Sequence, residues 1–464
     1  MSESSATETN SESVSRRKFI GKIATVATAT GVGLTAADYF LRVPQKVNAV
    51  TDQFVRVDNS DTTADFLNPK ISVGTGISKS ILNPGGNEQL QIAISSSSLV
   101  SPYRQLVWRD STTSYVKDGT TGSVTTYTSS TRDSDALNAA LNALTSGRTW
   151  KERVVVVGGL VGIAANISLP SYATLDLTGA LLKVQNSANL STGILTVSTN
   201  AANVEILGGV IDGNRTNQTA NGSHGILLLG GTSKVKIIGT KITNTYHSFG
   251  TYLAGNTSDV LLQDLTIDGT DGSAIASDSS NPGDNTNVRI IRPIITNYSD
   301  RVVTGFGGAF DAIHTEGTSG YVNRRWLIEG ADIDGTGSQV NGHGIDVGTL
   351  VEGRIIGCKT FKARLNGLAI ISSNYVKAFG NHFESSGQGG LAGYQNGIQV
   401  DDTGQTPAST YCSCTHNTLI NNIGYAAIEK GTADHNAFSD NLLTGNGNGI
   451  SKSGSNSQAI DNVT

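Results

Sequence analysis

The chain has 464 residues, of which 15% are charged and 6% aromatic, and it contains 55 glycines. Helical proteins of this length usually carry more charged residues, so the composition favours an all-β, turn-rich protein. The net charge of -5 gives no electrostatic preference for nucleic acid or for anionic membranes. The three cysteines (Cys358, Cys412 and Cys414) show no metal-type spacing, so the sequence assigns no metal ligands and predicts buried free thiols.

Residues 1–49 have the pattern of an export signal. Residues 15–20, Ser-Arg-Arg-Lys-Phe-Ile, precede a weakly apolar stretch over 21–37 and a small-residue site that ends at Ala49. This resembles a twin-arginine signal peptide. The resemblance implies a prokaryotic protein that is exported folded, is cleaved near Ala49 and is secreted or held at the cell surface without membrane contact. An uncleaved membrane anchor is the alternative, but the stretch is poorly apolar.

Residues 50–130 lead into the main domain. Residues 50–109 are predicted to be a small β segment, and the part over 58–94 resembles a short segment that precedes repetitive regions in bacteriophage tail fibres. A plain extended connection is the alternative. Residues 110–130 are dense in Ser and Thr and are predicted to be a linker.

Residues 131–464 show a repeat. Residues 133–144 carry acidic residues at their start and apolar residues at helical spacing, which predicts a short helix that closes the first coil. A small residue followed by Ile, Leu or Thr then recurs at intervals of roughly 20 to 40 residues, the range of solenoid repeats. The pairs are Gly225-Ile226, Gly250-Thr251, Ala274-Ile275, Ala312-Ile313, Gly344-Ile345, Gly367-Leu368, Gly397-Ile398, Ala427-Ile428 and Gly449-Ile450. The pattern predicts an all-β fold, a single-stranded right-handed parallel β-helix.

The predicted register places a polar cluster on one face. Side chains alternate along a strand, so the residue after each inward Ile or Leu points outward, and equivalent positions of neighbouring coils stack. Long insertions, such as residues 279–310, flank the face, as binding loops of solenoids do. The alternative is that these polar residues are merely solvated. The candidate catalytic residues are Asp278, His314, Glu316 and Asp346, and the same outward column runs on to Gln399 and Glu429.

Two mechanisms are open for this cluster. Asp278 and Glu316 lie on adjacent coils, and a carboxylate pair with separated pKa values serves glycoside hydrolysis. Alternatively, His314 oriented by Asp346 abstracts the C5 proton of a uronate, as a lyase or an epimerase does. Candidate substrate-binding residues are Tyr246, His247, Tyr252, Tyr298, Asp311 and Arg364.

The order of motifs after residue 131 resembles the pectate-lyase-like superfamily. It comprises the run of valines over 154–157, Ile-Ser-Leu-Pro over 167–170, and Asp-Ala-Ile-His-Thr-Glu-Gly over 311–317. The resemblance implies a β-helix and a carbohydrate polymer as ligand, and calcium as the cofactor of a lyase. Polygalacturonase-type members carry an aspartate where this chain has Tyr246, and the calcium-binding aspartates of pectate lyases have no clear match, so the reaction stays open.

The leading hypothesis is an exported enzyme, a lyase or glycoside hydrolase, that acts on an acidic polysaccharide. The alternative is a non-catalytic carbohydrate-binding fibre, adhesin or surface-layer protein on the same solenoid. Self-association as a homotrimer is also predicted, because fibrous oligomers carry segments like residues 58–94. Recurring turn residues are assigned structural roles between coils: His224, His343, Asn366, Asn396 and Asn448, the ladder Asn381, Asn417 and Asn441, and the turn aspartates Asp212, Asp268 and Asp334.

Overall fold

The structure is a computed structural model that describes residues 71–72, 77–82, 89–94, 101–278, 283–302, 310–317, 320–402 and 407–464. The chain divides into two units, Met1–Val100 and Ser101–Thr464. The expected export signal over 1–49 lies outside the described residues. Among the residues that are described, no helix combines the length and the apolar composition that a membrane span requires.

The described part of the first unit is one hairpin. β1 (Ile77–Leu82) pairs antiparallel with β2 (Gln89–Ile94), with Ile77 opposite Ile94 and Leu82 opposite Gln89. This agrees with a small β segment, while its likeness to a tail-fibre segment stays a prediction.

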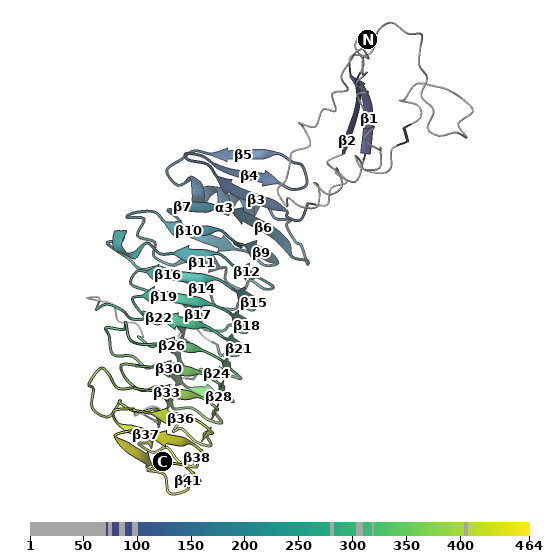
Figure 1. Ribbon diagram of the computed structural model, residues 1–464. Coiled ribbons are helices and arrows are strands. Elements are labelled where there is room, and N and C mark those ends of the chain that lie inside the picture. The colour runs from purple at the N-terminus through teal and green to yellow at the C-terminus, as the bar shows by residue number, and fades with distance from the viewer. Residues whose placement is uncertain are drawn as a thin grey trace, which may run out of the picture. The chain divides into compact units, whose positions relative to one another are not determined.

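The second unit is a right-handed parallel β-helix built from three sheets, as the sequence predicts (Figure 1). Each complete coil contributes strands to all three sheets, and coils stack through parallel ladders. We name the sheets A, B and C.

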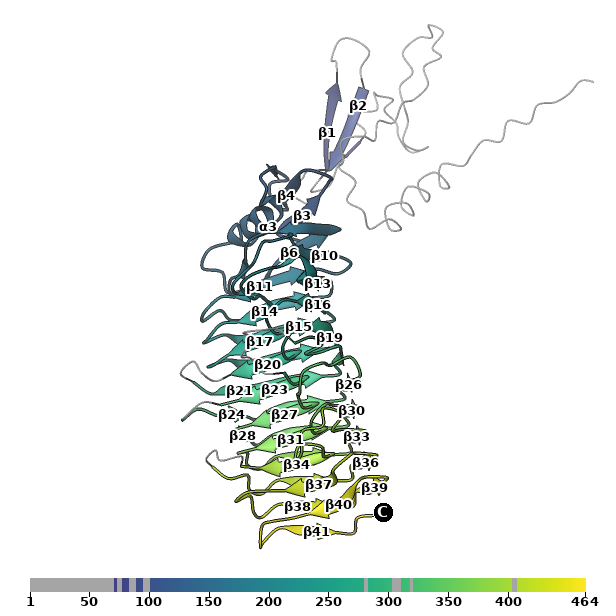
Figure 2. The ribbon, with the colours of Figure 1, turned by 90° about the vertical axis from the view of Figure 1, so that its left-hand side faces the viewer.

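Sheet A, whose strands form one stacked column in Figure 2, carries the predicted cluster. Its strands are β8 (Ile167–Leu169), β11 (Gly193–Val197), β14 (His224–Leu228), β17 (Thr251–Ala254), β20 (Ile275–Asp278), β23 (Ile313–Glu316), β27 (Ile345–Gly348), β31 (Leu368–Ile371), β34 (Ile398–Asp401), β37 (Tyr425–Glu429) and β40 (Asn448–Ser451).

Sheet B precedes sheet A in each coil. Its strands are β7 (Gly159–Ile163), β10 (Leu181–Val184), β13 (Val210–Asp212), β16 (Lys241–Thr245), β19 (Thr266–Thr270), β22 (Ile294–Thr296), β26 (Asp332–Asp334), β30 (Lys359–Phe361), β33 (His382–Glu384), β36 (Thr418–Ile420) and β39 (Leu442–Thr444).

Sheet C completes the coil. Its strands are β3 (Gln105–Arg109), β4 (Ser114–Asp118), β5 (Val124–Tyr127), β6 (Glu152–Val157), β9 (Ala173–Asp176), β12 (Glu205–Leu207), β15 (Ser233–Ile238), β18 (Ser258–Gln263), β21 (Asn285–Ile291), β24 (Asn323–Arg324), β25 (Leu327–Glu329), β28 (Leu350–Val351), β29 (Arg354–Ile356), β32 (Lys377–Phe379), β35 (Ser413–Thr415), β38 (Ala437–Ser439) and β41 (Gln458–Ile460).

The core is a stack of branched aliphatic side chains, one from each coil. Ile275 pairs with Ile313, Ile313 with Ile345, and the column continues through Leu368 to Ile398, all fully buried. A lone coil cannot bury its inner face, so this stacking is what makes the fold stable. The predicted register of the central coils is confirmed.

The predicted register is wrong at β37. The repeat aligned Ile428 with Ile398 and Ile450, but the structure pairs Ala427 with both. A shift of one residue exchanges the two faces of a strand. Glu429 therefore points into the core, where it is 2% exposed, and does not belong to the outward column.

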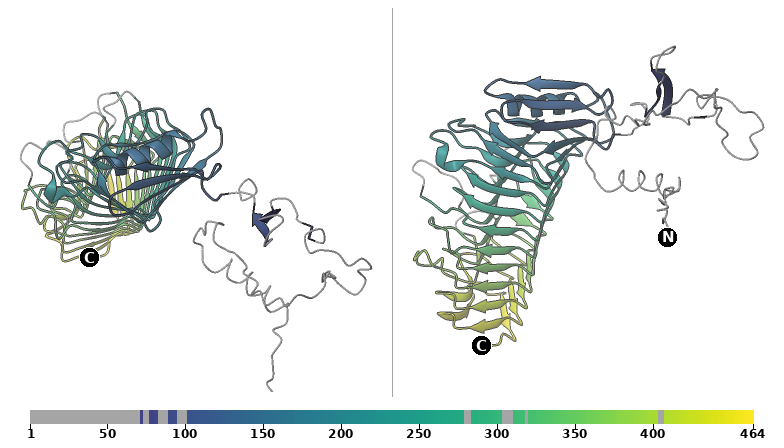
Figure 3. Two further views of the ribbon diagram at one scale, coloured as in Figure 1. Left: turned by 90° about the horizontal axis from the view of Figure 1, so that it is seen from above. Right: turned by 45° about the horizontal axis from the view of Figure 1, so that its top comes forward.

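The N-terminal end of the coil is closed by a helix, as predicted. α3 (Arg132–Asn142) buries Ala136, Leu137, Ala140 and Leu141 against β3, β4, β7 and β8, and it lies across the end of the coil in Figure 3. Near its start, the buried Asp133 accepts hydrogen bonds from Arg109 at 2.8 Å and from the backbone N–H of Gly162 at 2.7 Å.

Residues 110–130 are not a linker. β4 and β5 lie within this range, β4 pairs antiparallel with β3, and β3 pairs in parallel with β6 of the first coil. Thr, Tyr and Val are good strand formers, so a Ser/Thr-rich composition is compatible with sheet structure here. The second unit accordingly begins at Ser101.

The predicted asparagine ladder has the expected contacts. The side-chain amide of Asn381 donates to Asn417 at 2.9 Å, and that of Asn417 donates to Asn441 at 3.0 Å. Each also donates to a backbone carbonyl of the preceding coil, so the ladder satisfies buried backbone groups. The three thiols are buried and free.

Candidate functional site

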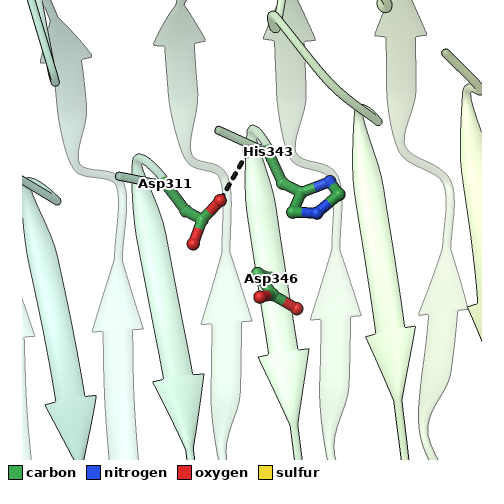
Figure 4. A group of neighbouring side chains, drawn as sticks. All are labelled: Asp311, His343 and Asp346. Atoms are coloured by element: carbon green, nitrogen blue, oxygen red, sulfur yellow. Dashed lines mark hydrogen bonds between the residues drawn. The ribbon is translucent and has the colours of Figure 1, made fainter. Parts of the chain in front are cut away.

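The predicted cluster forms where β23 and β27 begin on the outward face of sheet A. His314 of β23 lies opposite Asp346 of β27, and Asp311 and His343 lie in the turns just before these strands. Figure 4 shows Asp311, His343 and Asp346 side by side on neighbouring coils. With Glu316, we call these residues the His314 cluster.

His314 is held by three carboxylates. Its Nδ1 lies 2.9 Å from Asp311 Oδ2 and 3.4 Å from Asp346 Oδ2, and its Nε2 lies 3.6 Å from Glu316 Oε2. The side chains of His314, Asp311 and Asp346 are 13%, 8% and 12% exposed, whereas that of Glu316 is 48% exposed. The cluster thus has a buried end at Nδ1 and an open end at Nε2. Asp311, which the sequence assigned to substrate binding, is the nearer partner of Nδ1.

Asp311 and His343 also belong to a ladder between coils. The backbone N–H of His343 donates to Asp311 Oδ1 at 2.5 Å, and that of Asn366 donates to His343 Nδ1 at 3.2 Å. The ladder continues from Asn396 N–H to Asn366 Oδ1 at 2.9 Å. The structural role predicted for His343 is therefore present, and it coexists with a place in the cluster.

The environment separates the protonation states of the cluster. Burial alone would lower the pKa of His314, but the hydrogen bond to Asp311 and the nearby carboxylates of Asp346 and Glu316 outweigh it and raise the pKa well above its usual value. Burial would raise the pKa of Asp311, yet the hydrogen bond and the charge of His314 and the backbone N–H of His343 bring it below its usual value. Burial and the charge of Asp311 raise the pKa of Asp346. At neutral pH, His314 is an imidazolium and Asp311 a carboxylate.

The environment of Asp346 disfavours its ionised form. Its Oδ1 is buried and has no hydrogen-bond partner among the described residues. A buried oxygen without a donor disfavours the carboxylate, in agreement with the raised pKa.

One atom each of Asp311, His343 and Asp346 lies within 4.8 Å of the others, a spacing that suits a metal ion. The donor set does not. His343 Nδ1 accepts the N–H of Asn366, so a neutral ring carries its proton on Nε2 and has no lone pair left for a metal. The Nδ1 proton of His314 already lies between the two carboxylates. We therefore do not assign these residues as metal ligands.

For the predicted acid–base pair of Asp278 and Glu316, the structure describes the backbone positions of both residues but only the side chain of Glu316. The Cα atoms of Asp278 and Glu316 are partners across β20 and β23, as predicted. The side chain of Asp278 lies outside the described residues, so a pair of carboxylates stays a prediction.

Three predicted aromatic binding residues lie two coils before the strand that carries His314. Tyr252 is on β17, two strands away, and stacks on His224 with ring centroids 4.8 Å apart. Burial lowers the pKa of His224 to about 4, so this histidine is neutral at physiological pH. Tyr246 and His247 stack on each other at 4.3 Å, and the guanidinium of Arg301 lies 5.3 Å above the Tyr246 ring.

Two predicted binding residues have contacts within the fold, and the assignment of Arg364 to substrate binding stays a prediction. Tyr298 is fully buried in the core, so its assignment to substrate stacking is wrong. The Ser338 hydroxyl donates to the backbone carbonyl of Tyr298 at 2.7 Å. Arg364 donates to Asn341 Oδ1 at 3.3 Å and to the Ser338 carbonyl at 3.4 Å, and thereby ties two successive turns together.

The sequence missed residues that extend the site along sheet A. Tyr394 lies with its ring centroid 6.3 Å from that of His343, and the ammonium of Lys430 lies 4.9 Å above the Tyr394 ring. Both come from segments near the end of the chain, and Lys430 follows the strand whose register was misread. Correct pairing of β37 would have placed Lys430 in the outward column of Glu316.

No protein-family model matches the sequence, and no curated protein matches it. Among solved structures, the mannuronan C-5 epimerase AlgE6 A-module of Azotobacter vinelandii is 13% identical, and the match covers 71% of this chain and 95% of that chain with a TM-score of 0.40. A mutant of the periplasmic alginate epimerase AlgG is 10% identical over 67% of this chain and 76% of that chain, with a TM-score of 0.44. The surface adhesin PfbA of Streptococcus pneumoniae is 13% identical over 71% and 85%, with a TM-score of 0.39. Similarity at this level carries no argument about function, which must come from the chain's own residues.

Proposed function

We propose that the chain is a polysaccharide-active enzyme that uses the His314 cluster for acid–base chemistry, and that it acts as a lyase on a polysaccharide that contains uronic acids. One observation carries the proposal: a histidine, kept protonated by buried carboxylates, offers its Nε2–H beside an exposed carboxylate on the outward face of sheet A. Neighbouring titratable side chains whose pKa values are shifted in opposite directions are typical of catalytic sites.

The cluster supplies both halves of a β-elimination. Glu316 takes the C5 proton, the electrons of the C–H bond form the double bond between C4 and C5, and the bond from C4 to the glycosidic oxygen breaks. His314 Nε2 gives its proton to the leaving oxygen, and Asp311 and Asp346 stabilise the imidazolium before that step. The positive charge of His314 also lowers the cost of the anion that forms next to the uronate carboxylate. This replaces the role of base that the sequence suggested for His314, because a histidine with a raised pKa is an acid at neutral pH.

The test is turnover of a panel of acidic and neutral polysaccharides by the purified mature chain. A lyase produces unsaturated uronates, which absorb ultraviolet light, whereas a hydrolase produces reducing ends without that absorbance. His314→Gln and Glu316→Gln should each lower kcat by about 10²- to 10⁴-fold. His382 and Glu384 are the matched control, because they form a similar pair at 3.0 Å on sheet B. Unchanged kcat in both cluster variants would refute the site, and reducing ends alone would convert the proposal to a hydrolase.

A non-catalytic carbohydrate-binding protein is the second candidate, and a separate surface favours it. Tyr375 and Tyr411 stack with ring centroids 5.3 Å apart, and they are 54% and 51% exposed. Exposed aromatic side chains are common in sites that hold sugar rings. Binding to polysaccharide that Tyr411→Ala abolishes, with no product formed by the wild type, would establish this candidate instead.

We also propose export by the twin-arginine route, on the basis of Arg16 and Arg17. Replacement of both by lysine should leave precursor inside the cell, whereas normal appearance of the mature chain outside the cytoplasmic membrane would refute the route. The homotrimer stays a prediction, and the mass of the mature chain by light scattering would check it.

A further inference from the structure

A lysine lies on the same face of sheet A, beyond the His314 cluster. Lys430 directly follows Glu429, which pairs with Val400 of β34, so Lys430 continues the outward column that contains Asp401, Ile371 and Glu316. Asp346 and Lys430 belong to β27 and to the end of β37, three strand steps apart. At about 4.8 Å for each step, this is about 14 Å along the solenoid axis.

A loop covers this part of the face and fixes Lys430. The segment over 385–397 joins β33 to β34, and the Lys430 ammonium donates to the carbonyl of Gly393 within it. The ammonium also lies 4.9 Å above the Tyr394 ring. Because the Tyr394 ring is 6.3 Å from the His343 ring, it bridges the cluster and Lys430.

The charge of Lys430 has no full counterion. Its ammonium donates to Gln399 Oε1 at 3.2 Å, but that oxygen also accepts from Asn366 and Asn396, each at 3.1 Å. Within the described part of the chain, no carboxylate oxygen lies within 4.0 Å of this ammonium. Burial lowers the pKa of Lys430, and the more distant charge of Asp401 opposes that effect.

A lysine that is partly removed from water without an ion pair costs free energy unless an anion completes its surroundings. Neutral acceptors occupy two directions, from Gly393 and Gln399. An ammonium has three protons, so one remains for a ligand.

We propose that Lys430, positioned by Tyr394 and Gln399, is an anion-binding subsite that takes the carboxylate of an acidic sugar residue located along the same polysaccharide chain that reacts at the His314 cluster. The inference rests on the proposed function and adds the direction of the bound polysaccharide, which then crosses the coils parallel to the solenoid axis. It also adds a requirement on the substrate, which must carry negative charge well away from the reacting sugar.

The experiment measures binding separately from turnover. Glu316→Gln is the inactive background, because its half-exposed side chain contributes little to stability. The probes are oligomers of galacturonate and of alginate long enough to span both positions, with a neutral oligosaccharide of similar length for comparison. In that background, Lys430→Met should weaken binding of at least one acidic oligomer about 10- to 100-fold, since a hydrogen bond to a charged group is worth about 1.5–3 kcal/mol. The salt dependence of binding should fall, and binding of the neutral probe should not change. Lys452→Met is the matched control, because Lys452 is an exposed lysine one coil further.

Lys430→Arg distinguishes a binding role from a loop clamp. It keeps the charge, so it should restore most of the affinity, whereas Lys430→Met should not. If both variants bind acidic oligomers as tightly as the background does, or if Lys430→Arg keeps the wild-type melting temperature and still fails to bind, the subsite is refuted.

The two proposals fail in different ways. Lys430-dependent binding without turnover by the wild type would remove the lyase and keep the subsite. Turnover that depends on His314 and Glu316, with kcat and KM both unchanged by Lys430→Met, would keep the lyase and remove the subsite. When both hold, the variant raises KM and leaves kcat nearly unchanged, which is the signature of lost binding far from the reacting atoms.

Discussion

His314→Gln should destabilise the protein strongly, although His314 lies on the outward face. The substitution keeps a hydrogen-bonding side chain but removes the positive charge between Asp311 and Asp346, whose residues are 6% and 8% exposed. Removal of one partner from a buried charge pair costs about 3–5 kcal/mol, because the remaining charge stays buried without compensation. The contact with Glu316 adds little, since a half-exposed ion pair is worth at most about 1 kcal/mol.

The cost should depend on pH in a defined direction. The pKa of His314 is raised in the folded state, so its stabilisation is complete below the unfolded value of about 6.5 and is lost as pH rises through the folded pKa. The pKa of Asp311 is lowered, so its contribution is complete above about 3.9 and is lost as pH falls through the folded pKa. The difference in stability between wild type and His314→Gln should therefore be largest between these limits and shrink on both sides.

Urea unfolding midpoints across the pH range test this reasoning. Asp346→Asn in the His314→Gln background should recover much of the loss, because it removes a carboxyl whose folded pKa is raised and whose ionised form is therefore disfavoured. Two results would refute the assignment of a buried imidazolium: a midpoint difference that does not change with pH, or no recovery from Asp346→Asn.

Three further changes test the register and the core. Ile313→Ala removes a fully buried side chain next to His314 and should cost about 2–5 kcal/mol in unfolding free energy, with a smaller loss for Ile313→Val; little loss for Ala would mean that the inward face is misassigned. Glu429→Ala leaves four donors without their acceptor and should cost about 1–3 kcal/mol in unfolding free energy for each donor that stays buried. Residues 453–457 should then become open to proteolysis and hydrogen exchange, and full protection there would contradict the inward carboxylate. Asn417→Ala interrupts the ladder and should lower the melting temperature more than Asn374→Ala at the solenoid corner, and equal effects would deny the ladder a special role.

The fold follows from the sequence because its main determinant repeats. Ile275, Ile313 and Ile345 stack directly on one another, and each sits behind a small residue that lets the neighbouring coil approach. The Cβ that a side chain would add at Gly344 lies 2.7 Å from the carbonyl oxygen of Gly367, so a larger residue there would force the coils apart. The same close approach to a backbone carbonyl oxygen recurs at Gly225, Gly250, Gly367 and Gly397, and the sequence shows this repetition.

The predicted register is wrong at β37, where the pattern of a small residue followed by an apolar one is ambiguous. At β37 the sequence offers Ala426, Ala427 and Ile428 in a row, and hydrophobicity alone favours Ile428 as the inward residue. The structure prefers Ala427 inward because Glu429 then reaches Asn436 and Ser457, and the N–H groups of residues 453 and 454. Four hydrogen bonds to one buried carboxylate outweigh the transfer of one isoleucine from water, and they come from residues far along the chain that a local pattern does not include.

The chemistry of the site is hidden for a related reason, since it occupies a column that is structural elsewhere. Asn366 and Asn396 each accept the backbone N–H of the next coil, and Asp311 and His343 do the same two and one coils earlier. An amide in this column satisfies the backbone and adds no charge. A carboxylate or an imidazole also satisfies the backbone, but it brings a second heteroatom that titrates, and Asp311 directs that atom at His314 Nδ1. A change from asparagine to aspartate in this column keeps the backbone hydrogen bond between coils, and at Asp311 it places a carboxylate beside His314. In this chain, the titratable residues in an otherwise amide ladder therefore mark the coils of the His314 cluster more clearly than the outward strand positions do, since Ala369 and Gln399 occupy those positions on the very next coils.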